Sequence, residues 1–157
     1  MADELNTLVF TLDAGDGKGG DVVIRLRPDL APDHVARIRE LVEEGFYDGI
    51  VFHRVIDGFM AQGGDPGGTG AGGSDKPNLK AEFSREPHVR GTASMARTND
   101  PNSANSQFFI CFDDCGFLDG QYTVWGEVIE GMEHVDSLPK GEPPRNPGKI
   151  AKASLKA

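Results

Sequence analysis

The stretch that decides the fold runs from residue 51 to residue 73 and reads V-F-H-R-V-I-D-G-F-M-A-Q-G-G-D-P-G-G-T-G-A-G-G. It opens with an apolar, β-branched segment that carries one cation, Arg54, in its middle. Asp57-Gly58 is a turn signal, and a loop rich in glycine follows Gln62. A second stretch, S-Q-F-F-I at residues 106–110, adds an amide and large apolar side chains. Together the two stretches offer a guanidinium, two amides and apolar surface, but no obvious nucleophile, metal cage or proton shuttle.

The length and composition of the chain indicate one soluble globular domain that spans residues 1–157. Hydrophobic residues make up 38% and charged residues 26%, and the net charge of −9 argues against binding to nucleic acid or to an anionic membrane. No apolar run approaches the roughly 20 residues that cross a bilayer. The acidic start, residues 1–4, is not followed by the apolar segment of a signal peptide. We therefore expect a cytoplasmic monomer whose two cysteines, Cys111 and Cys115, are reduced thiols.

Turn signals and hydrophobic periodicity predict about eight short strands and two helices. Seven segments have the pattern of strands: residues 5–12, 22–27, 51–56, 91–96, 107–112, 122–129 and 150–155. A short apolar segment near residues 79–83 brings the count to eight. One helix is expected from Pro32 to Gly45, which suit a first turn and a C-terminal stop, and a second over residues 131–138. Because strands and helices do not alternate, we expect a mainly β fold, a closed eight-stranded antiparallel barrel capped by the two helices.

Four motifs closely resemble those of the cyclophilins, which are peptidyl-prolyl cis-trans isomerases. They are F-H-R-V-I-x-G-F-M-x-Q-G-G at residues 52–64, S-Q-F-F-I at 106–110, F-L-D-G at 117–120 and W-G-E-V-I-E-G-M at 125–132. The resemblance runs in order from about Thr7 to Ile150 and is strongest to the small bacterial cytoplasmic type. It implies an eight-stranded antiparallel barrel with two helices, in agreement with the strand count.

The resemblance also implies a set of site residues. It assigns catalysis to Arg54, Phe59 and Gln62. It assigns substrate binding to Met60, Gly70, Ala96, Arg97, Thr98, Gln107, Phe109, Phe117, Leu118 and Tyr122. Phe117 and Tyr122 stand where many eukaryotic relatives have Trp and His. We therefore expect only weak binding of cyclosporin, the cyclic peptide that many members of this family bind tightly.

These residues suit the isomerisation of an X–Pro bond, whose rotation barrier is roughly 18–20 kcal/mol. No covalent bond breaks in this reaction, so it requires neither a nucleophile nor a cofactor. Arg54 could donate a hydrogen bond to the proline nitrogen as the amide twists, and Gln62 could hold Arg54 or the substrate carbonyl. We therefore predict an isomerase of proline-containing peptides and of unfolded or folding proteins, which acts by stabilising the transition state without covalent catalysis.

Some of these features admit other interpretations. His53 alternates with Arg54 along a strand and should face the opposite side, which favours a structural role. The other histidines lack metal-ligand spacing, so we expect no metal site. Residues 68–73 match G-x-G-x-x-G but open no helix, which is typical of a loop at the rim of a groove. The alternative function is a peptide-binding chaperone module on the same fold with incidental catalysis. A nucleotide-binding protein is a third hypothesis, which lacks the phosphate-binding Lys-Ser/Thr pair.

Overall fold

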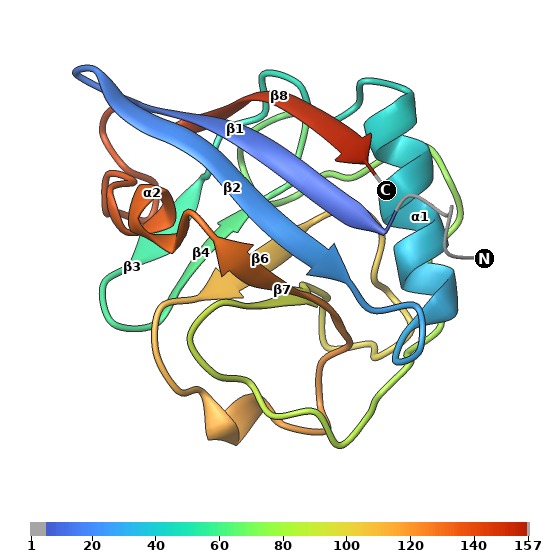
Figure 1. The fold of residues 1–157 in the computed structure, drawn as a ribbon. Helices are drawn as coiled ribbons and strands as arrows, with labels where there is room; N and C mark the ends of the chain where they lie inside the picture. The colour runs from blue at the N-terminus through green and yellow to red at the C-terminus, as the bar shows by residue number, and fades with distance from the viewer. Residues whose placement is uncertain (1–5, 157) are drawn as a thin grey trace.

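The computed structural model describes residues 6–156 and shows one antiparallel sheet of eight strands with two α-helices (Figure 1). The strands are β1 (Thr7–Gly15), β2 (Lys18–Leu26), β3 (Arg54–Ile56), β4 (Met60–Gly63), β5 (Thr92–Met95), β6 (Phe108–Cys111), β7 (Val124–Glu130) and β8 (Lys149–Lys156). Their order in the sheet is β3-β4-β6-β5-β7-β2-β1-β8. The helices are α1 (Pro32–Glu43) and α2 (Met132–Asp136), and a 3-10 turn covers Gly116–Leu118. The predicted fold class, mainly β with two helices, is confirmed.

The sheet is open and strongly curled rather than fully closed. Within residues 6–156 no ladder of hydrogen bonds joins its edge strands, β3 and β8. Instead, the chain just before β3 meets the start of β8 in an isolated bridge between Val51 and Lys149. Beside it, the amide of Phe52 donates to the carbonyl of Gly148 at 2.8 Å. The prediction of a closed barrel is therefore not confirmed.

The hydrophobic residues that predicted strands at 5–12 and 22–27 and the first helix are buried in the structure, on one face of each element. In the hairpin, alternate side chains point into the core, as the period of a strand requires. The buried set on these two strands includes Leu8, Phe10, Leu12, Val22, Ile24 and Leu26. In α1 the buried apolar side chains are Val35, Ile38, Leu41 and Val42. Pro32 begins this helix as predicted, and Gly45, at φ +75°, follows its last turn.

The strand β4 was not predicted, because residues 60–63 lie between the strand expected at 51–56 and the glycine loop that follows Gln62. A tight turn at Gly58, φ +72°, folds β4 back onto β3 and pairs Arg54 with Gln62. Glycine and glutamine are weak strand formers, so the local pattern conceals a segment that is stabilised by pairing with β6. Conversely, the segment near residues 79–83 contributes one isolated bridge, from Leu79 to Ala104, and no strand.

Phe108 lies at the centre of the main core. Its ring stacks on Phe10 at 5.4 Å and meets the rings of Tyr47 at 5.7 Å and Trp125 at 6.0 Å edge-on. The next residue, Phe109, points to the other face of the sheet because side chains alternate along a strand. There it belongs to a second, smaller cluster, whose buried members are Met60, Phe109, Cys111, Cys115 and Leu118.

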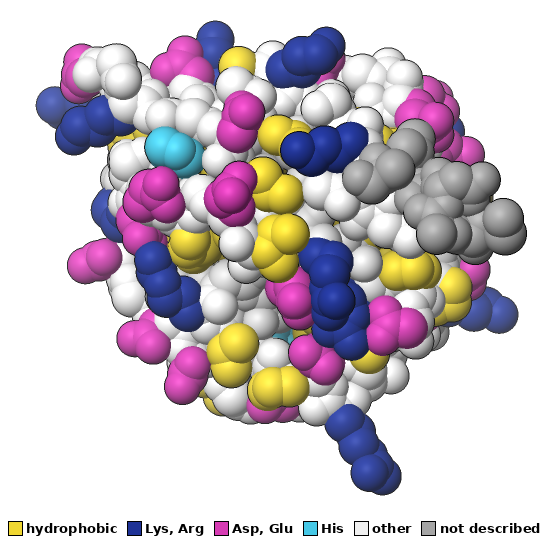
Figure 2. Space-filling model, in the orientation of Figure 1, with side chains coloured by type: hydrophobic (Ala, Val, Ile, Leu, Met, Phe, Trp, Pro, Cys, Tyr) yellow, Lys and Arg dark blue, Asp and Glu magenta, His cyan; other side chains and the backbone are white. Residues whose placement is uncertain are grey.

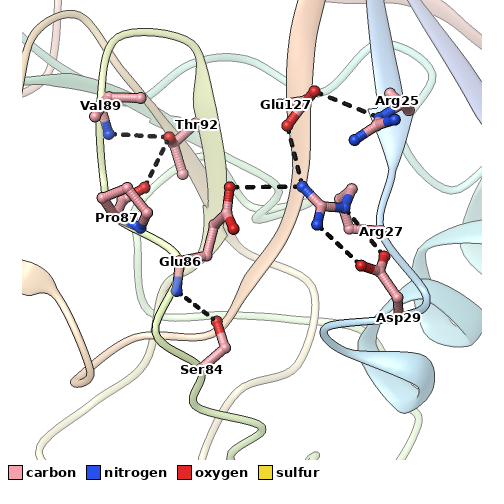
Figure 3. A network of polar contacts seen from close by, with 9 residues as sticks. All are labelled: Arg25, Arg27, Asp29, Ser84, Glu86, Pro87, Val89, Thr92 and Glu127. Carbon is pink, nitrogen blue, oxygen red and sulfur yellow. Dashed lines mark hydrogen bonds and ion pairs between the residues drawn. The ribbon is translucent and has the colours of Figure 1, made fainter.

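A network of ion pairs connects the end of β2 to two other parts of the chain (Figure 3). The guanidinium of Arg27 lies 2.9 Å from Asp29, 3.2 Å from Glu127 in β7, and 3.5 Å from Glu86 in the segment before β5. The Arg27 side chain is 17% exposed, so these contacts are partly shielded from solvent. The network therefore joins the segment before β5 to β7 and to the end of β2.

On the face shown in Figure 2, acidic and basic side chains are interspersed, and exposed apolar side chains occur singly or in small groups. In the part of the chain that the structure describes, no helix is long and apolar enough to span a membrane.

The position of Phe108 predicts a large loss of stability on truncation. Phe108→Ala should lower the free energy of unfolding by about 3–5 kcal/mol, because it leaves a cavity among buried rings. Urea denaturation followed by the fluorescence of Trp125, the single tryptophan, measures this loss. Phe117→Ala is the matched control, since Phe117 is 67% exposed and its removal should change stability by less than about 1 kcal/mol. Equal stabilities of the two variants would contradict the assignment of the core.

Candidate active site

A cavity of about 130 Å³ lies on the side of β4 and β6 that faces away from the main core. Its lining comprises Arg54, Phe59, Met60, Gln62, Ala96, Arg97, Phe109, Leu118 and Tyr122. Every one of these residues belongs to the set that the sequence analysis proposed for the site. The arrangement places two guanidinium groups, those of Arg54 and Arg97, and the amide of Gln62 around a pocket whose other lining side chains are hydrophobic or aromatic.

A larger cavity of about 370 Å³ adjoins the first, and the two share Gln62, Ala96 and Arg97. It also brings in three other predicted residues, Gly70, Thr98 and Gln107. Ala71, Gly72 and Gly73 also line it, as expected for a loop at the rim of a groove. The remaining lining residues, which were not predicted, are Ser74, Asn78, Ser103 and Asn105. Phe117 lines neither cavity. It lies at the rim, where its ring centroid is 5.6 Å from that of Phe59.

Phe109 forms the floor of the first cavity and is held on both sides. The ring of Tyr122 meets it edge-on at 5.6 Å, and the ring of His88 stacks against it at 6.1 Å. His88 is buried, and its ring nitrogens contact the Ser94 hydroxyl and the Asp119 carboxylate, each at 3.0 Å. Burial lowers the pKa of His88, although its hydrogen bond to Asp119 opposes that effect. His88, which the sequence analysis left without a role, is thus a neutral support for the cavity floor.

Arg54 is held by two acceptors on different sides of its guanidinium. Its Nε donates to the carboxylate of Glu142 at 3.0 Å, and its Nη1 donates to the amide oxygen of Gln62 at 3.4 Å. Glu142 was not predicted, and it lies 88 residues further along the chain. Its loop is fixed to β3 because Gly141 and Val55 exchange two backbone hydrogen bonds of 2.8 Å. The hydrogen bonds orient the guanidinium while its side chain remains 44% exposed.

Two glutamines continue the hydrogen bonding from Arg54 into the glycine loop. The amide nitrogen of Gln62 donates to the side-chain oxygen of Gln107 at 3.0 Å. Gln107 in turn donates to the carbonyls of Gly70 at 2.9 Å and Gly72 at 2.7 Å. The loop that borders the larger cavity is therefore linked to the guanidinium through side-chain amides.

The glycine loop is built around the buried carboxylate of Asp65, which is 1% exposed. Asp65 accepts hydrogen bonds from the backbone amides of Gly67 at 2.9 Å, Thr69 at 3.0 Å and Gly70 at 2.7 Å. Burial raises the pKa of Asp65, but these donors together outweigh it and lower the pKa to about 2. The amides that would have to cradle a phosphate already bind this carboxylate, which argues against the nucleotide-binding hypothesis.

His53 lines neither of the two cavities and is buried beside the glycine loop. Burial lowers its pKa, so the ring is neutral near pH 7. Cys111 and Cys115 are free thiols buried under the first cavity, and burial raises the pKa of each. Within residues 6–156 no group of three or more His, Cys, Asp or Glu side chains is arranged to hold a metal ion.

The sequence is similar to members of one protein family over nearly its whole length. The family model for "Cyclophilin type peptidyl-prolyl cis-trans isomerase/CLD" matches residues 9–155. A "Probable peptidyl-prolyl cis-trans isomerase" of Brucella suis is 54% identical over 172 aligned positions, which cover 99% of this chain and 85% of the relative. "Peptidyl-prolyl cis-trans isomerase B" of Bacillus subtilis is 41% identical over 126 positions, which cover 79% of this chain and 87% of that one.

Solved structures show the same similarity in three dimensions. The cyclophilin AquaCyp293 from Hirschia baltica superposes with a TM-score of 0.86 at 34% identity, over 96% of this chain and 74% of the other. A cyclophilin type peptidyl-prolyl cis-trans isomerase of Cryptosporidium parvum, crystallised in the presence of the dipeptide Ala-Pro, gives a TM-score of 0.87 at 28% identity. The superposition covers 96% of this chain and 99% of that one.

The role of Asp65 predicts a pH-dependent contribution to stability. Asp65→Asn should lower the free energy of unfolding at pH 7 by about 1–3 kcal/mol, because the loop amides lose a charged acceptor. The folded-state pKa of about 2 lies below the unfolded value of roughly 3.9, so this contribution is complete above about pH 4 and is lost as the pH falls toward 2. Urea denaturation between pH 3 and pH 7 should show the two proteins converging at the acid end.

Asp75→Asn is the matched control for this prediction, since Asp75 lies in the same segment and is exposed. Its stability should follow that of the unaltered protein at every pH. A gap between Asp65→Asn and the unaltered protein that stays constant with pH would contradict the role given to the Asp65 carboxylate.

Proposed function

The chain belongs to the family of cyclophilin-type peptidyl-prolyl cis-trans isomerases, and from that premise we propose that the first cavity is its catalytic site. Arg54, Phe59 and Gln62 are the proposed catalytic residues. The observation that carries the proposal is the oriented guanidinium of Arg54 beside the buried hydrophobic side chains of a cavity of about 130 Å³. The proposed substrates are X–Pro bonds in peptides and in unfolded or folding proteins.

The chemistry follows from what changes when a prolyl amide twists. Resonance between nitrogen and carbonyl is lost, and the proline nitrogen gains lone-pair character. A donor that faces this nitrogen interacts more strongly with the twisted amide than with the planar one, which is the condition for catalysis. Arg54 provides such a donor, because its hydrogen bonds to Glu142 and Gln62 use one N–H of Nε and one of Nη1 and leave further N–H groups available.

The hydrophobic walls provide the other requirement, a grip on the proline ring that lets the rest of the amide rotate. Met60, Phe109 and Leu118 are each less than a tenth exposed and belong to one packed cluster. Their burial against Cys111 and Cys115 gives the pocket a firm base. The crystallisation of the Cryptosporidium parvum relative with the dipeptide Ala-Pro supports a proline peptide as the ligand of this chain also.

Gln62 couples the guanidinium to the second cavity. It accepts a hydrogen bond from Arg54 and donates one to Gln107, so both sides of its amide are engaged. In this proposal Gln62 orients Arg54, while the second cavity holds residues of the substrate next to the proline. The residues of the second cavity that are proposed to bind this part of the substrate are Gly70, Ala96, Arg97, Thr98 and Gln107.

Replacement of the guanidinium tests the mechanism. Arg54→Ala should lower kcat/KM for an Ala-Pro test peptide by about 10²–10³ while the protein stays folded, because the donor acts mainly in the transition state. Exchange spectroscopy by NMR measures the isomerisation without a coupled protease, and thermal unfolding checks the fold. Arg25→Ala, an exposed arginine on β2, is the matched control and should retain full activity.

Near-normal activity of Arg54→Ala would overturn the proposed mechanism. Retained peptide binding without isomerisation by the unaltered protein would instead favour the chaperone-module hypothesis.

The rim of the site leads to a proposal about inhibition. Phe117 is 67% exposed beside Phe59, and its ring carries no hydrogen-bond donor. A Trp at this position would offer an indole N–H to an acceptor of a bound cyclic peptide such as cyclosporin. Since an acceptor that is desolvated without a partner costs about 1–3 kcal/mol, the unaltered protein should bind cyclosporin weakly.

Phe117→Trp should therefore bind cyclosporin about ten-fold more tightly than the unaltered protein. Titration of the inhibitor in the isomerisation assay gives both affinities, and kcat/KM without inhibitor should change little because the proline cavity is not altered. Tight binding by the unaltered protein, or no gain in the variant, would show that the donor at this position does not set the affinity.

A further inference from the structure

The guanidinium of Arg97 is fixed in the wall that the two cavities share. Its Nε and Nη2 donate to the carbonyl of Gln121 at 3.0 and 2.7 Å, and its Nη1 donates to the carbonyl of Thr98 at 2.9 Å. The guanidinium carbon also lies 4.6 Å from the ring centroid of Tyr122. A long, half-buried side chain is thus held in one orientation by three hydrogen bonds and one ring contact, all with uncharged groups.

In the part of the chain that the structure describes, no carboxylate pairs with this charge. Within residues 6–156, no Asp or Glu oxygen lies within 4 Å of Arg97, whereas Arg27, Arg54 and Arg90 each pair with at least one. A guanidinium has five N–H donors, and three of those on Arg97 are used by the carbonyls. Two N–H groups and the full positive charge of Arg97 therefore remain for a ligand.

The lining of the second cavity has the same electrostatic character. Apart from Arg97 it consists of side-chain amides, hydroxyls, glycines and alanines, and it contains no carboxylate. The chain as a whole carries a net charge of −9, so this cavity is locally positive on an acidic protein. An anionic ligand group should therefore bind in this cavity in preference to other parts of the acidic surface.

We propose that Arg97 makes the enzyme selective for X–Pro substrates that carry an Asp or Glu side chain close to the proline, with that side chain placed in the second cavity. The inference rests on the proposed function, because it takes the first cavity as the site of the proline ring. The proline ring and the acidic side chain would lie close together, because the first and second cavities share a wall formed by Gln62, Ala96 and Arg97. The carboxylate accepts hydrogen bonds from the two free N–H groups of Arg97. These charge-assisted bonds are stronger than those that a glutamine side chain could form in the same place.

The test compares peptides that differ by one charge. The parent peptide has alanine at every position around a central Ala-Pro bond. In three series, the residue two before, three before or one after the proline is replaced by Glu, Gln or Lys, so that each acidic peptide has an isosteric neutral control. The readout is the ratio of kcat/KM for the Glu peptide to that for the Gln peptide, measured by NMR exchange at 50 mM and 500 mM NaCl.

The unaltered protein should show a Glu/Gln ratio of about three- to ten-fold in one series, with the Lys peptide below the Gln peptide. The ratio should fall in 500 mM salt, which screens a contact between partly exposed charges. Arg97→Gln should bring the ratio close to one, and Arg97→Lys should keep part of it because the charge remains while the planar contacts with Gln121 and Tyr122 are lost. Because each ratio is taken within one protein, it does not depend on how far a variant changes the overall rate.

Arg25→Gln is the matched control and should leave the ratio unchanged, since Arg25 is an exposed arginine on β2. Equal rates for Glu and Gln peptides in every series, or a preference that survives in Arg97→Gln, would overturn the role of Arg97. Failure of the proposed function has a different signature, because the unaltered protein would then not isomerise even the parent alanine peptide.

Discussion

The alternation of side chains along β6 is the constraint on which the site and the core both depend. Phe108 and Phe109 are adjacent in the chain, yet one fills the centre of the main core and the other forms the floor of the first cavity. A shift of the strand by one residue would exchange the two and destroy both environments at once. The register is secured by β4 on one side and β5 on the other, where Gln62 and Ser94 both lie opposite Phe109. Packing of the core thus also positions the side chains of the proposed site.

A continuous series of hydrogen bonds crosses this surface. It begins at Glu142, passes through Arg54, Gln62 and Gln107, and ends at the carbonyls of the glycine loop. Asp65 then binds the amides of that same loop from beneath. Each side-chain amide in the series donates on one side and accepts on the other, so none can rotate without losing a partner. The guanidinium is therefore oriented before any substrate arrives, which lowers the reorganisation required during the reaction.

The sequence predicted the fold class and the residues that line the first cavity, because the motifs that carry them are long and continuous. It did not reveal β4, since Gln62 and Gly63 are weak strand formers and their stabilising partner, β6, lies about 45 residues away. Glu142 and Asp65 were missed for a related reason. Each is an ordinary loop carboxylate until the fold places it, one beside a guanidinium 88 residues distant and the other beneath a row of backbone amides. Local patterns report what a segment prefers, whereas these roles arise from contacts between distant segments.

The two adjoining cavities share a wall and neither is enclosed, so the site is a groove along the surface rather than a hole that leads inward. A polypeptide can enter such a groove sideways, with its preceding and following residues continuing into solvent at both ends. The enzyme does not need a chain terminus to thread, and no lid has to open before the proline is seated. A proline in the middle of a long nascent chain, or in an exposed turn of a protein that has already acquired part of its structure, is then as accessible as one in a short peptide.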